Sequence, residues 1–447
     1  MPEILILSFI SNFKMREAHD RPDFLRLLFS TVLGATKSIE IAYEDFDDVM
    51  KNGVYFDGSS VPGYASVNSS DLLLKPRSSR PVLLPWEKDV AVLVCGVFEA
   101  SGDPHPRDPS GALSRIVDSA REAGFELRVG SELEFFLVKE NGRGTIVPGD
   151  GGGYFSTLPS DGGLQFRRHV AKSLSSIGVS TTTHHHEVAA GQHEVGLRFS
   201  SATNAADDVM LARLLIAELA HEIGAIATFM PKPFSGMNGS GMHIHQSLWS
   251  IEEKVNLFSC GKSGEVSKLA GSYVAGILEH AGALAAIVAP NVNSFKRLTP
   301  GYEAPTRIAW GLRNRSTMIR VPQYNGSNVR ARIEFRCPDP SCSSHLAVAA
   351  TLAAGLDGIG KGLTPPAPTG DNLYESNAET ESLPGSLSEA LEKLKQDKVV
   401  VDAIGKSLVD MIVRIRTAEW KEYVELTGDP GISEVTPWEV TKYLHFN

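Results

Sequence analysis

The sequence has few cysteines, and none of them is placed for a disulfide framework or a zinc site. Only four occur among 447 residues, and no two of them form a C-x-x-C pair; they are Cys95, Cys260, Cys337 and Cys342. Small disulfide-rich domains and zinc ribbons both need closely spaced cysteine pairs, so neither class is indicated. We therefore expect the chain to fold around a hydrophobic core in a reducing compartment, the cytoplasm.

Long hydrophobic runs and an excess of basic residues are missing as well. The apolar stretch ILILSFI at residues 4–10 is too short to span a bilayer, follows no basic residue and precedes no small-residue cleavage site. Acidic residues outnumber basic ones, 53 against 43, which gives a net charge of −10. Because nucleic-acid binding depends on clustered Lys and Arg, we expect neither a nucleic acid nor a membrane as partner.

The composition is that of a globular chain large enough for more than one core. Hydrophobic residues make up 42% of it and charged residues 21%. Short apolar runs in the first hundred residues predict strands, and the proline cluster GDPHPRDPSG predicts a boundary. We expect a small domain over residues 1–105 and a larger one over 106–447. In the larger one, strands alternate with helices predicted at residues 163–177, 204–224, 264–289 and 343–360.

One predicted strand carries two histidines on the same face. In NGSGMHIHQSLW, the alternation of a strand places His243, His245 and Ser247 on one side and apolar residues on the other. The Gly- and Ser-rich turn before it has little side-chain bulk, so a ligand can approach the backbone there. A half-buried strand with hydrogen-bonded histidines explains the same pattern, and other segments must decide between the two.

Three further segments place acidic residues on polar strand faces or at a turn. GSELEFFLV puts Glu132 and Glu134 on one face, where two buried carboxylates repel unless a proton or a cation neutralises them. VRARIEFRCPD puts Glu334 between two arginines, and HHHEVAAGQHE brings Glu187 and Glu194 together across a turn. Each glutamate alone is compatible with a surface position. Together they favour one cavity, and its oxygen ligands suit Mg²⁺ or Mn²⁺.

An arginine-rich segment follows at residues 293–322. Its guanidinium groups could bind phosphate or carboxylate in pairs of hydrogen bonds, although surface ion pairs explain Arg307 and Arg313 equally well. Divalent metals beside arginines favour phosphoryl transfer, in which positioning and charge neutralisation dominate. No Walker A sequence is present, because GIGKG at residues 358–362 lacks the required spacing, so a nucleotide would be held in another way.

These segments resemble, in order, the motifs of prokaryotic-type glutamine synthetases. The matches are FDGSS with NSSD, GSELEF, HHEVAAGQHEV, TFMPKP with NGSGMHIHQS, KRLTPGYEAP with RNRS, and RIEFRCPDP, and the resemblance extends from about Leu27 to Leu444. It implies an α+β fold. A small β-grasp-like N-terminal domain would precede a large α/β catalytic domain built around an antiparallel sheet that forms a half-barrel.

The resemblance also assigns roles to residues. One Mg²⁺ or Mn²⁺ ion would be held by Glu134, Glu187 and Glu194, and a second, bridging the ATP phosphates, by Glu132, His243 and Glu334. Glutamate and the migrating phosphoryl group would contact Asn238, Gly239, Arg297, Arg315 and Arg336. ATP, the co-substrate, would lie along Phe199, His245, Ser247, Arg332 and Arg315.

The remaining implied residues concern ammonia. Glu303 would lie on a flap that closes the glutamate site. Asp57, Ser60 and Asp71 belong to a Gly- and Ser-rich stretch that predicts an exposed loop, and they would reach the site of a neighbouring subunit in two stacked hexameric rings. Glutamate would attack the γ-phosphate of ATP to give γ-glutamyl phosphate, from which ammonia displaces phosphate. Asp57, Ser60 and Glu303 would select ammonium and remove its proton.

Two alternatives to a glutamine synthetase stay open. A γ-glutamyl-amine ligase of the same superfamily would use a polyamine or methylamine, and a catalytically silent relative would serve as a scaffold or sensor. The sequence departs from the family pattern at Ser69, Met237 and the SSHL segment of residues 343–346, none of which is an implied metal ligand. Tyr374 occupies the place where some bacterial members are adenylylated, but unmodified members also have a tyrosine there, and an exposed loop tyrosine is the simpler interpretation.

Overall fold

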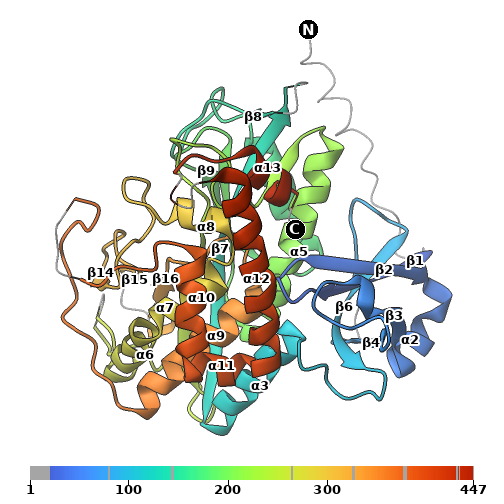
Figure 1. The fold of residues 1–447 in the computed structure, drawn as a ribbon, viewed down its shortest axis with the longest axis horizontal. Coiled ribbons are helices and arrows are strands. Elements are labelled where there is room, and N and C mark those ends of the chain that lie inside the picture. Colours follow the sequence, from blue (N-terminus) through green and yellow to red (C-terminus); the bar gives the residue numbers. More distant parts are fainter. Residues whose placement is uncertain are drawn as a thin grey trace.

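The computed structural model describes residues 21–78, 81–141, 145–262, 265–324, 328–375, 380–428, 431 and 433–445. The apolar stretch at residues 4–10, expected to be neither a signal peptide nor a membrane span, lies outside the described residues. The rest forms two β-sheets and the helices packed on them, with the smaller sheet at one side of the molecule (Figure 1).

The smaller sheet is built from the first hundred residues, as the apolar runs predict. Its strands run in the order β2-β1-β6-β4-β3, with β5 against β6, and only the β1–β6 pair is parallel. Leu25 and Leu27 alternate inward on β1 and are fully buried. The strands are β1 (Phe24–Ser30), β2 (Thr36–Ala42), β3 (Val54–Asp57), β4 (Asp71–Pro76), β5 (Val82–Leu83) and β6 (Val90–Glu99), with helix α2 (Phe46–Asn52) between β2 and β3.

The larger sheet is organised around one long central strand, β7 (Phe125–Glu140), which pairs with β8, β10, β11, β12 and β13. The main path is β14-β15-β16-β13-β7-β10-β9, and every pair except β14–β15 is antiparallel. The antiparallel sheet expected for this part of the chain is therefore present. The other strands are β8 (Ile146–Pro148), β9 (Thr181–His186), β10 (Gln192–Leu197), β11 (Ser200–Ser201), β12 (Ile226–Thr228), β13 (Met242–Ser250), β14 (Trp310–Leu312), β15 (Ile319–Val321) and β16 (Ile333–Phe335).

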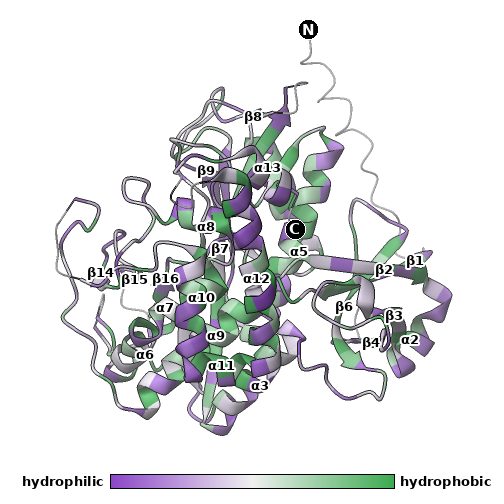
Figure 2. Ribbon diagram, in the orientation of Figure 1, coloured by the Kyte–Doolittle hydropathy of each residue, from purple (hydrophilic) through white to green (hydrophobic). Residues whose placement is uncertain are grey.

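Helices pack against this sheet and against one another around a continuous hydrophobic core. Figure 2 shows hydrophobic residues concentrated on the central helices and strands, with hydrophilic residues on the outer faces. Helices α6 and α9 approach so closely that a side chain on Gly276 would collide with the carbonyl of Ala354. The helices are α3 (Pro109–Glu122), α4 (Leu164–Ser176), α5 (Ala202–Glu222), α6 (Lys268–Glu279), α7 (Ala281–Val288), α8 (Val292–Arg297), α9 (Ser344–Gly360), α10 (Leu387–Gln396), α11 (Lys398–Ile404), α12 (Lys406–Thr427) and α13 (Pro437–Tyr443).

Two predicted elements differ from what the structure contains. The helix expected over residues 264–289 is two helices, α6 and α7, bent by 75° at His280. The imidazole of His280 bonds to Asp397 at 2.7 Å and to Asp357 at 3.1 Å, and these tertiary contacts hold the chain at the break. The strand expected in VRARIEFRCPD extends only over Ile333–Phe335, so Arg332 and Arg336 flank it.

None of the described helices alone is long and apolar enough to cross a bilayer, and only the bent pair α6 and α7, taken together, meets that length and composition.

A candidate metal and nucleotide site on the large sheet

The site begins with the pairing of three strands of the large sheet. In the register of β7 and β13, Glu132 lies opposite His243, and in the register of β7 and β10, Glu134 lies opposite Glu194. Side chains directly opposite each other on antiparallel strands share a face and lie close together. The alternation of polar and apolar residues read from the sequence thus converges on one spot.

The side-chain distances show how tight this cluster is. The Nδ1 atom of His243 lies 3.1 Å from a carboxylate oxygen of Glu132, and its Nε2 atom lies 3.8 Å from Glu134. Ligand atoms of Glu132, Glu194 and His243 all lie within 4.8 Å of one another, a spacing suited to a single ion. Glu134, Glu194 and His243 are buried, which limits how well water can screen their charges.

The hairpin of β9 and β10 adds the second pair of carboxylates. The backbone N–H of Glu187 donates to the carbonyl of Gln192 at 2.8 Å and closes the turn. His185 then lies 3.5 Å from Glu187 and 3.2 Å from Glu194, and the three residues form a second group able to hold a metal. The structure therefore brings Glu187 and Glu194 together, as the turn in HHHEVAAGQHE predicts.

Burial and mutual repulsion raise the pKa values of Glu187 and Glu194. Burial, reinforced by the nearby Glu134 and Glu194, raises the pKa of Glu187 to about 9. Burial and the carboxylates around it also raise the pKa of Glu194 well above its usual range. Buried acids that hold protons near neutral pH are characteristic of a site that a cation would neutralise. The donor set of carboxylate oxygens and one imidazole fits Mg²⁺ or Mn²⁺.

Glu334 lies on the edge of this cluster and is bracketed by two arginines. It is fully buried, with Arg320 at 2.5 Å and Arg336 at 2.6 Å. Although burial opposes ionisation, the charge of Arg336 and the nearby histidines lower the pKa of Glu334 to about 2. It is the register partner of His245, whose Nε2 atom lies 2.9 Å from Glu132, so Glu334, His245 and Glu132 belong to three successive strands, β16, β13 and β7.

A glycine-rich loop borders the cluster on the side of α8. The carboxylate of Glu134 accepts from the backbone N–H of Gly241 at 2.8 Å and from the side chain of Gln192 at 3.1 Å. Gln192 also donates to the carbonyl of Gly239. A side chain at Gly239 would lie 2.3 Å from the carbonyl of Pro231, so only glycine fits there. The loop is thereby tied to a candidate metal ligand and leaves its backbone close to the cluster.

Arg297 and Glu303 lie beside the same loop. The guanidinium of Arg297 is buried and donates to the carbonyls of Cys337 at 2.8 Å and Arg336 at 3.1 Å. Glu303 is exposed, adopts a left-handed backbone with φ of 57°, and accepts from the side chain of Asn238 at 3.3 Å. Such a conformation is uncommon for a residue other than glycine and often accompanies a functional position.

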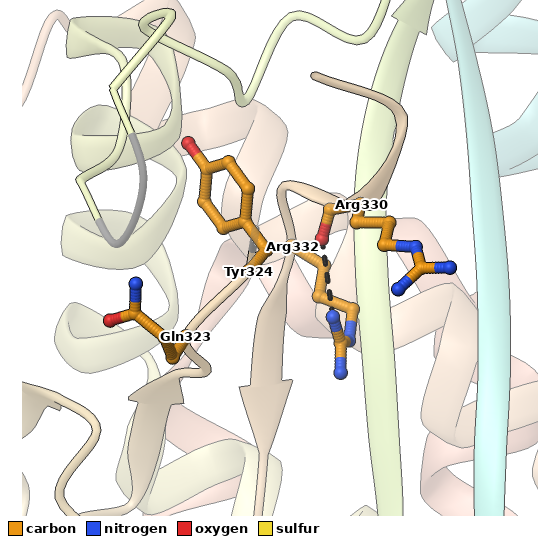
Figure 3. Close-up of a pocket in the computed structure, with 4 residues that line it drawn as sticks. All are labelled: Gln323, Tyr324, Arg330 and Arg332. Atoms are coloured by element: carbon orange, nitrogen blue, oxygen red, sulfur yellow. Dashed lines mark hydrogen bonds between the residues drawn. The ribbon is translucent and has the colours of Figure 1, made fainter. Parts of the chain in front are cut away.

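An opening lies near His245. It has a volume of about 320 Å³ and is lined by Gln323, Tyr324, Arg330 and Arg332 (Figure 3). The Nε atom of Arg332 donates to Nδ1 of His245 at 3.2 Å, which connects the opening to Glu132. Of the other residues implied for ATP, Phe199 is exposed, whereas Ser247 is buried and its hydroxyl accepts from Trp249 at 3.0 Å.

Several residues singled out in the sequence do not join the cluster through the contacts described. Asp57 ends β3 and Asp71 begins β4 of the small sheet, and these strands lie away from β7 in Figure 1. Ser60 lies in the turn after β3 and donates to Asp57 at 2.6 Å, and Asp71 is the cross-strand partner of Asp57. Arg315 is exposed, although its charge acts on Glu194. Arg307 donates to the carbonyl of Thr380 at 3.1 Å and to the hydroxyl of Ser382 at 3.0 Å.

Sequence reasoning missed some residues at the edge of the cluster. The rings of Tyr154 and Phe155 pack edge-on against His185, with centroids 5.6 and 4.8 Å away. His185 shares the strand alternation of Glu187, and that spacing could have identified it. Tyr154 follows a run of glycines and shows no such periodicity. Tyr374 is half-buried rather than exposed, and its hydroxyl donates to the carbonyl of Arg315 at 3.0 Å.

Comparison with known proteins relates this site to one family. The profile described as "Glutamine synthetase, catalytic domain" matches residues 106–443, and "Glutamine synthetase, beta-Grasp domain" matches residues 21–100. Curated proteins named glutamine synthetase are 42% identical in Methanococcus maripaludis and 41% identical in Thermotoga maritima, each over 94% of this chain and 96% of the relative. The enzyme of that name from Methanocaldococcus jannaschii is 42% identical over 94% of this chain and 95% of its own.

Solved structures show the same architecture. A structure described as a GmaS/ADP complex superposes with a TM-score of 0.83 at 28% identity, covering 95% of this chain and 97% of the other. An apo GmaS structure matches equally well. The fold expected from the sequence, a β-grasp domain followed by a catalytic domain on a curled, half-barrel sheet, is confirmed. The chain belongs to the glutamine synthetase family of ligases and contains both of its domains.

Proposed function

We propose that this enzyme is a glutamine synthetase, joining ammonia to the γ-carboxylate of L-glutamate at the expense of ATP. The observation that supports this most directly is the convergence of buried carboxylates and a histidine on one face of the sheet, with arginines at its edge. The curated relatives named glutamine synthetase support the same reaction. A silent scaffold would have no need to keep such a costly set of buried acids.

The residues expected to hold metal fall into the two groups implied by the resemblance. Glu134, Glu187 and Glu194 would hold one Mg²⁺ or Mn²⁺, and Glu132, His243 and Glu334 would hold the other. When bound, the ions supply positive charge that neutralises the phosphates of ATP in the transition state. Glu334 is ion-paired with Arg320 and Arg336, so it would give up part of these ion pairs in order to bind a metal.

The protein's own groups would then position the two reactants. Arg297, Arg315 and Arg336 would bind the glutamate carboxylate and the phosphoryl group, and Asn238 and Gly239 would orient glutamate through the backbone and amide. ATP would extend from His245 and Ser247 toward Phe199 and the opening beside Arg332. The γ-carboxylate of glutamate attacks the γ-phosphate and releases ADP, and ammonia then displaces phosphate from the acyl phosphate. Closure of the loop carrying Glu303 would keep water away from that intermediate.

The nitrogen donor is tested with purified protein, ATP, Mg²⁺ and glutamate. We expect phosphate release to be fastest with ammonium, because the carboxylates of Asp57 and Glu303, with the hydroxyl of Ser60, would select a small cation. Methylamine and putrescine serve as the competing donors. Faster release with either amine would identify a γ-glutamyl-amine ligase instead, and no glutamate-dependent release with any donor would support the catalytically silent alternative.

We also propose that each active site is completed by a neighbouring subunit, in an assembly of two stacked hexameric rings. The domain boundary would lie between residues 105 and 106, and the enzyme would work in the cytoplasm. Asp57 is exposed on the small sheet and contacts Ser59 and Ser60, whereas the candidate metal ligands lie on the large sheet. Mixing inactive Asp57→Ala subunits with inactive Glu334→Ala subunits should therefore restore part of the activity. Native mass spectrometry must confirm mixed oligomers, and if they form without any recovery, each chain completes its own site.

A further inference from the structure

A buried carboxylate near the end of the chain lies outside the site described above. Glu439 belongs to the short helix α13 and is fully buried. One of its oxygens accepts from the side chain of Asn293 at 2.7 Å, and the other accepts from Lys296 at 2.5 Å. The second oxygen also accepts from the backbone and hydroxyl of Thr436, both at 2.9 Å, in the cap of its own helix. The same side chain thus caps α13 and binds two residues of α8.

Asn293 also binds the backbone of Lys232, in the segment that leads into the glycine-rich loop. Its side-chain oxygen accepts from the backbone N–H of Lys232 at 2.6 Å, and its side-chain nitrogen donates to the carbonyl of Lys232 at 2.9 Å. Asn293 is itself fully buried, so all three of its contacts are made without water. An amide fixed at three points holds the backbone of Lys232 in one orientation.

The side chain of Lys232 extends the network to both borders of the substrate site. Its ammonium group donates to the carbonyl of Met237, directly before Asn238. The same group lies 3.3 Å from the centre of the Tyr302 ring, next to Glu303. Between these points, the backbone N–H of Ser240 donates to the carbonyl of Pro231 at 2.8 Å. A single lysine therefore connects the loop of residues 237–241 with the segment that carries Glu303.

A buried ion pair is a weak device for stability alone, because removing charges from water costs about as much as their attraction returns. Apolar side chains could join α13 to α8 at least as well. The ion pair of Glu439 and Lys296 instead fixes the positions of Asn293 and of α8. Arg297, directly after Lys296, is the last residue of that helix. Residues directly beside the groups held by this network, namely Asn238, Arg297 and Glu303, are proposed to bind glutamate or to close over it. None of these three lines the opening beside Arg332.

We infer that Glu439 is a positioning residue for glutamate, acting through Asn293 and Lys232 on the loop of residues 237–241 and on the segment that carries Glu303. This inference rests on the proposed function, because it assumes that these two segments bind glutamate. It predicts a selective defect. Loss of Glu439 should weaken glutamate binding and leave ATP binding almost unchanged.

The test compares the Michaelis constants for the two substrates. Glu439→Ala should raise KM for glutamate about tenfold, within the range of coupling reported for residues that act through others, while KM for ATP changes less than about twofold. Asn293→Ala should have a similar effect. The double variant should be no worse than the more affected single variant, because both residues act along one path. Additive effects, or equal increases for glutamate and ATP, would overturn the inference.

Two further variants distinguish a positioning role of Glu439 from a general role in attaching α13 to the protein. Glu439→Gln keeps the size of the side chain and an oxygen for Asn293, so it should raise KM for glutamate less than Glu439→Ala does, and it is the variant to use if the alanine protein does not fold. Glu422→Ala is the matched control. Glu422 is an exposed carboxylate that also bonds to α13, through Trp438 at 2.9 Å and Lys442 at 3.1 Å. It should leave KM for glutamate unchanged, and an increase equal to that of Glu439→Ala would mean that general anchoring of α13 is responsible.

A measurement that needs no catalysis keeps this inference separate from the proposed function. Backbone hydrogen exchange in the unliganded protein should become faster over residues 231–241 and 298–304 in Glu439→Ala, and not in Glu422→Ala. Unchanged exchange over these segments would contradict the network. Failure of the wild-type protein to make glutamine would instead overturn the proposed reaction, whatever the exchange shows.

Discussion

Replacing Glu334 by Gln is expected to weaken both metal and ATP binding and to lower kcat/KM for ATP by at least ~100-fold, the order of magnitude seen when a group that stabilises transition-state charge is removed. The carboxylate is fully buried and ionised, and it lies between Arg320 and Arg336. The amide cannot balance those two guanidinium groups, nor can it supply a charged ligand. The measurement is a calorimetric titration with Mn²⁺, with and without ATP.

The control for this result must remove one carboxylate charge at a position outside the cluster. Glu218→Gln meets that condition, because Glu218 is ion-paired with Arg26 at 3.2 Å and hydrogen-bonded to Trp86, outside the cluster. Its metal titration should match the wild type. If Glu334→Gln also binds Mn²⁺ with wild-type affinity, Glu334 is not a metal ligand, and the second ion must be assigned to other residues.

Glu303→Ala is expected to form γ-glutamyl phosphate but to lose nearly all glutamine synthesis, because only the second step needs a base for ammonium. Losses of about 10²- to 10⁴-fold are typical when a positioned base is removed. Hydroxylamine is already uncharged at neutral pH, so it should still capture the acyl phosphate. The diagnostic quantity is the ratio of hydroxamate to glutamine formed, which should rise steeply in the variant.

The left-handed backbone at Glu303 calls for a second substitution. Glu303→Gln keeps the side-chain length and an oxygen acceptor for Asn238, so it should preserve the loop while removing the base. Both variants should therefore show the same change in the product ratio. Glutamine synthesis near the wild-type rate in Glu303→Gln would remove this carboxylate from the mechanism and leave Asp57 as the remaining candidate.

The parts of the site that could be predicted are those that local periodicity determines. Strand alternation alone placed Glu132 and Glu134 on the same face of one strand and His243 and His245 on the same face of another. The pairing of the two strands then brought Glu132 opposite His243 on one face of the sheet. The roles of these residues in binding metal and substrates stay predictions. The family and the fold, by contrast, are confirmed by the two matched domains.

The features that could not be predicted depend on partners far away in the sequence. The break at His280 results from Asp357 and Asp397, which are 77 and 117 residues away. The hold of Glu439 on Asn293 joins residues that are 146 positions apart. Neither contact leaves a local trace, because a histidine in an apolar helix and a glutamate in a capping box both have ordinary local explanations. Tertiary packing alone gives them a structural role.

The length of β7 has a consequence for how this family of sequences can change. This strand pairs with five others, and its polar face holds Glu132 and Glu134. Inserting or deleting one residue in its middle would turn every following side chain to the opposite face and shift several pairings at once. Point substitutions can be absorbed one at a time, whereas a change of length cannot. Insertions and deletions should therefore accumulate in the connecting loops, and β7 should keep its length even where its residues differ.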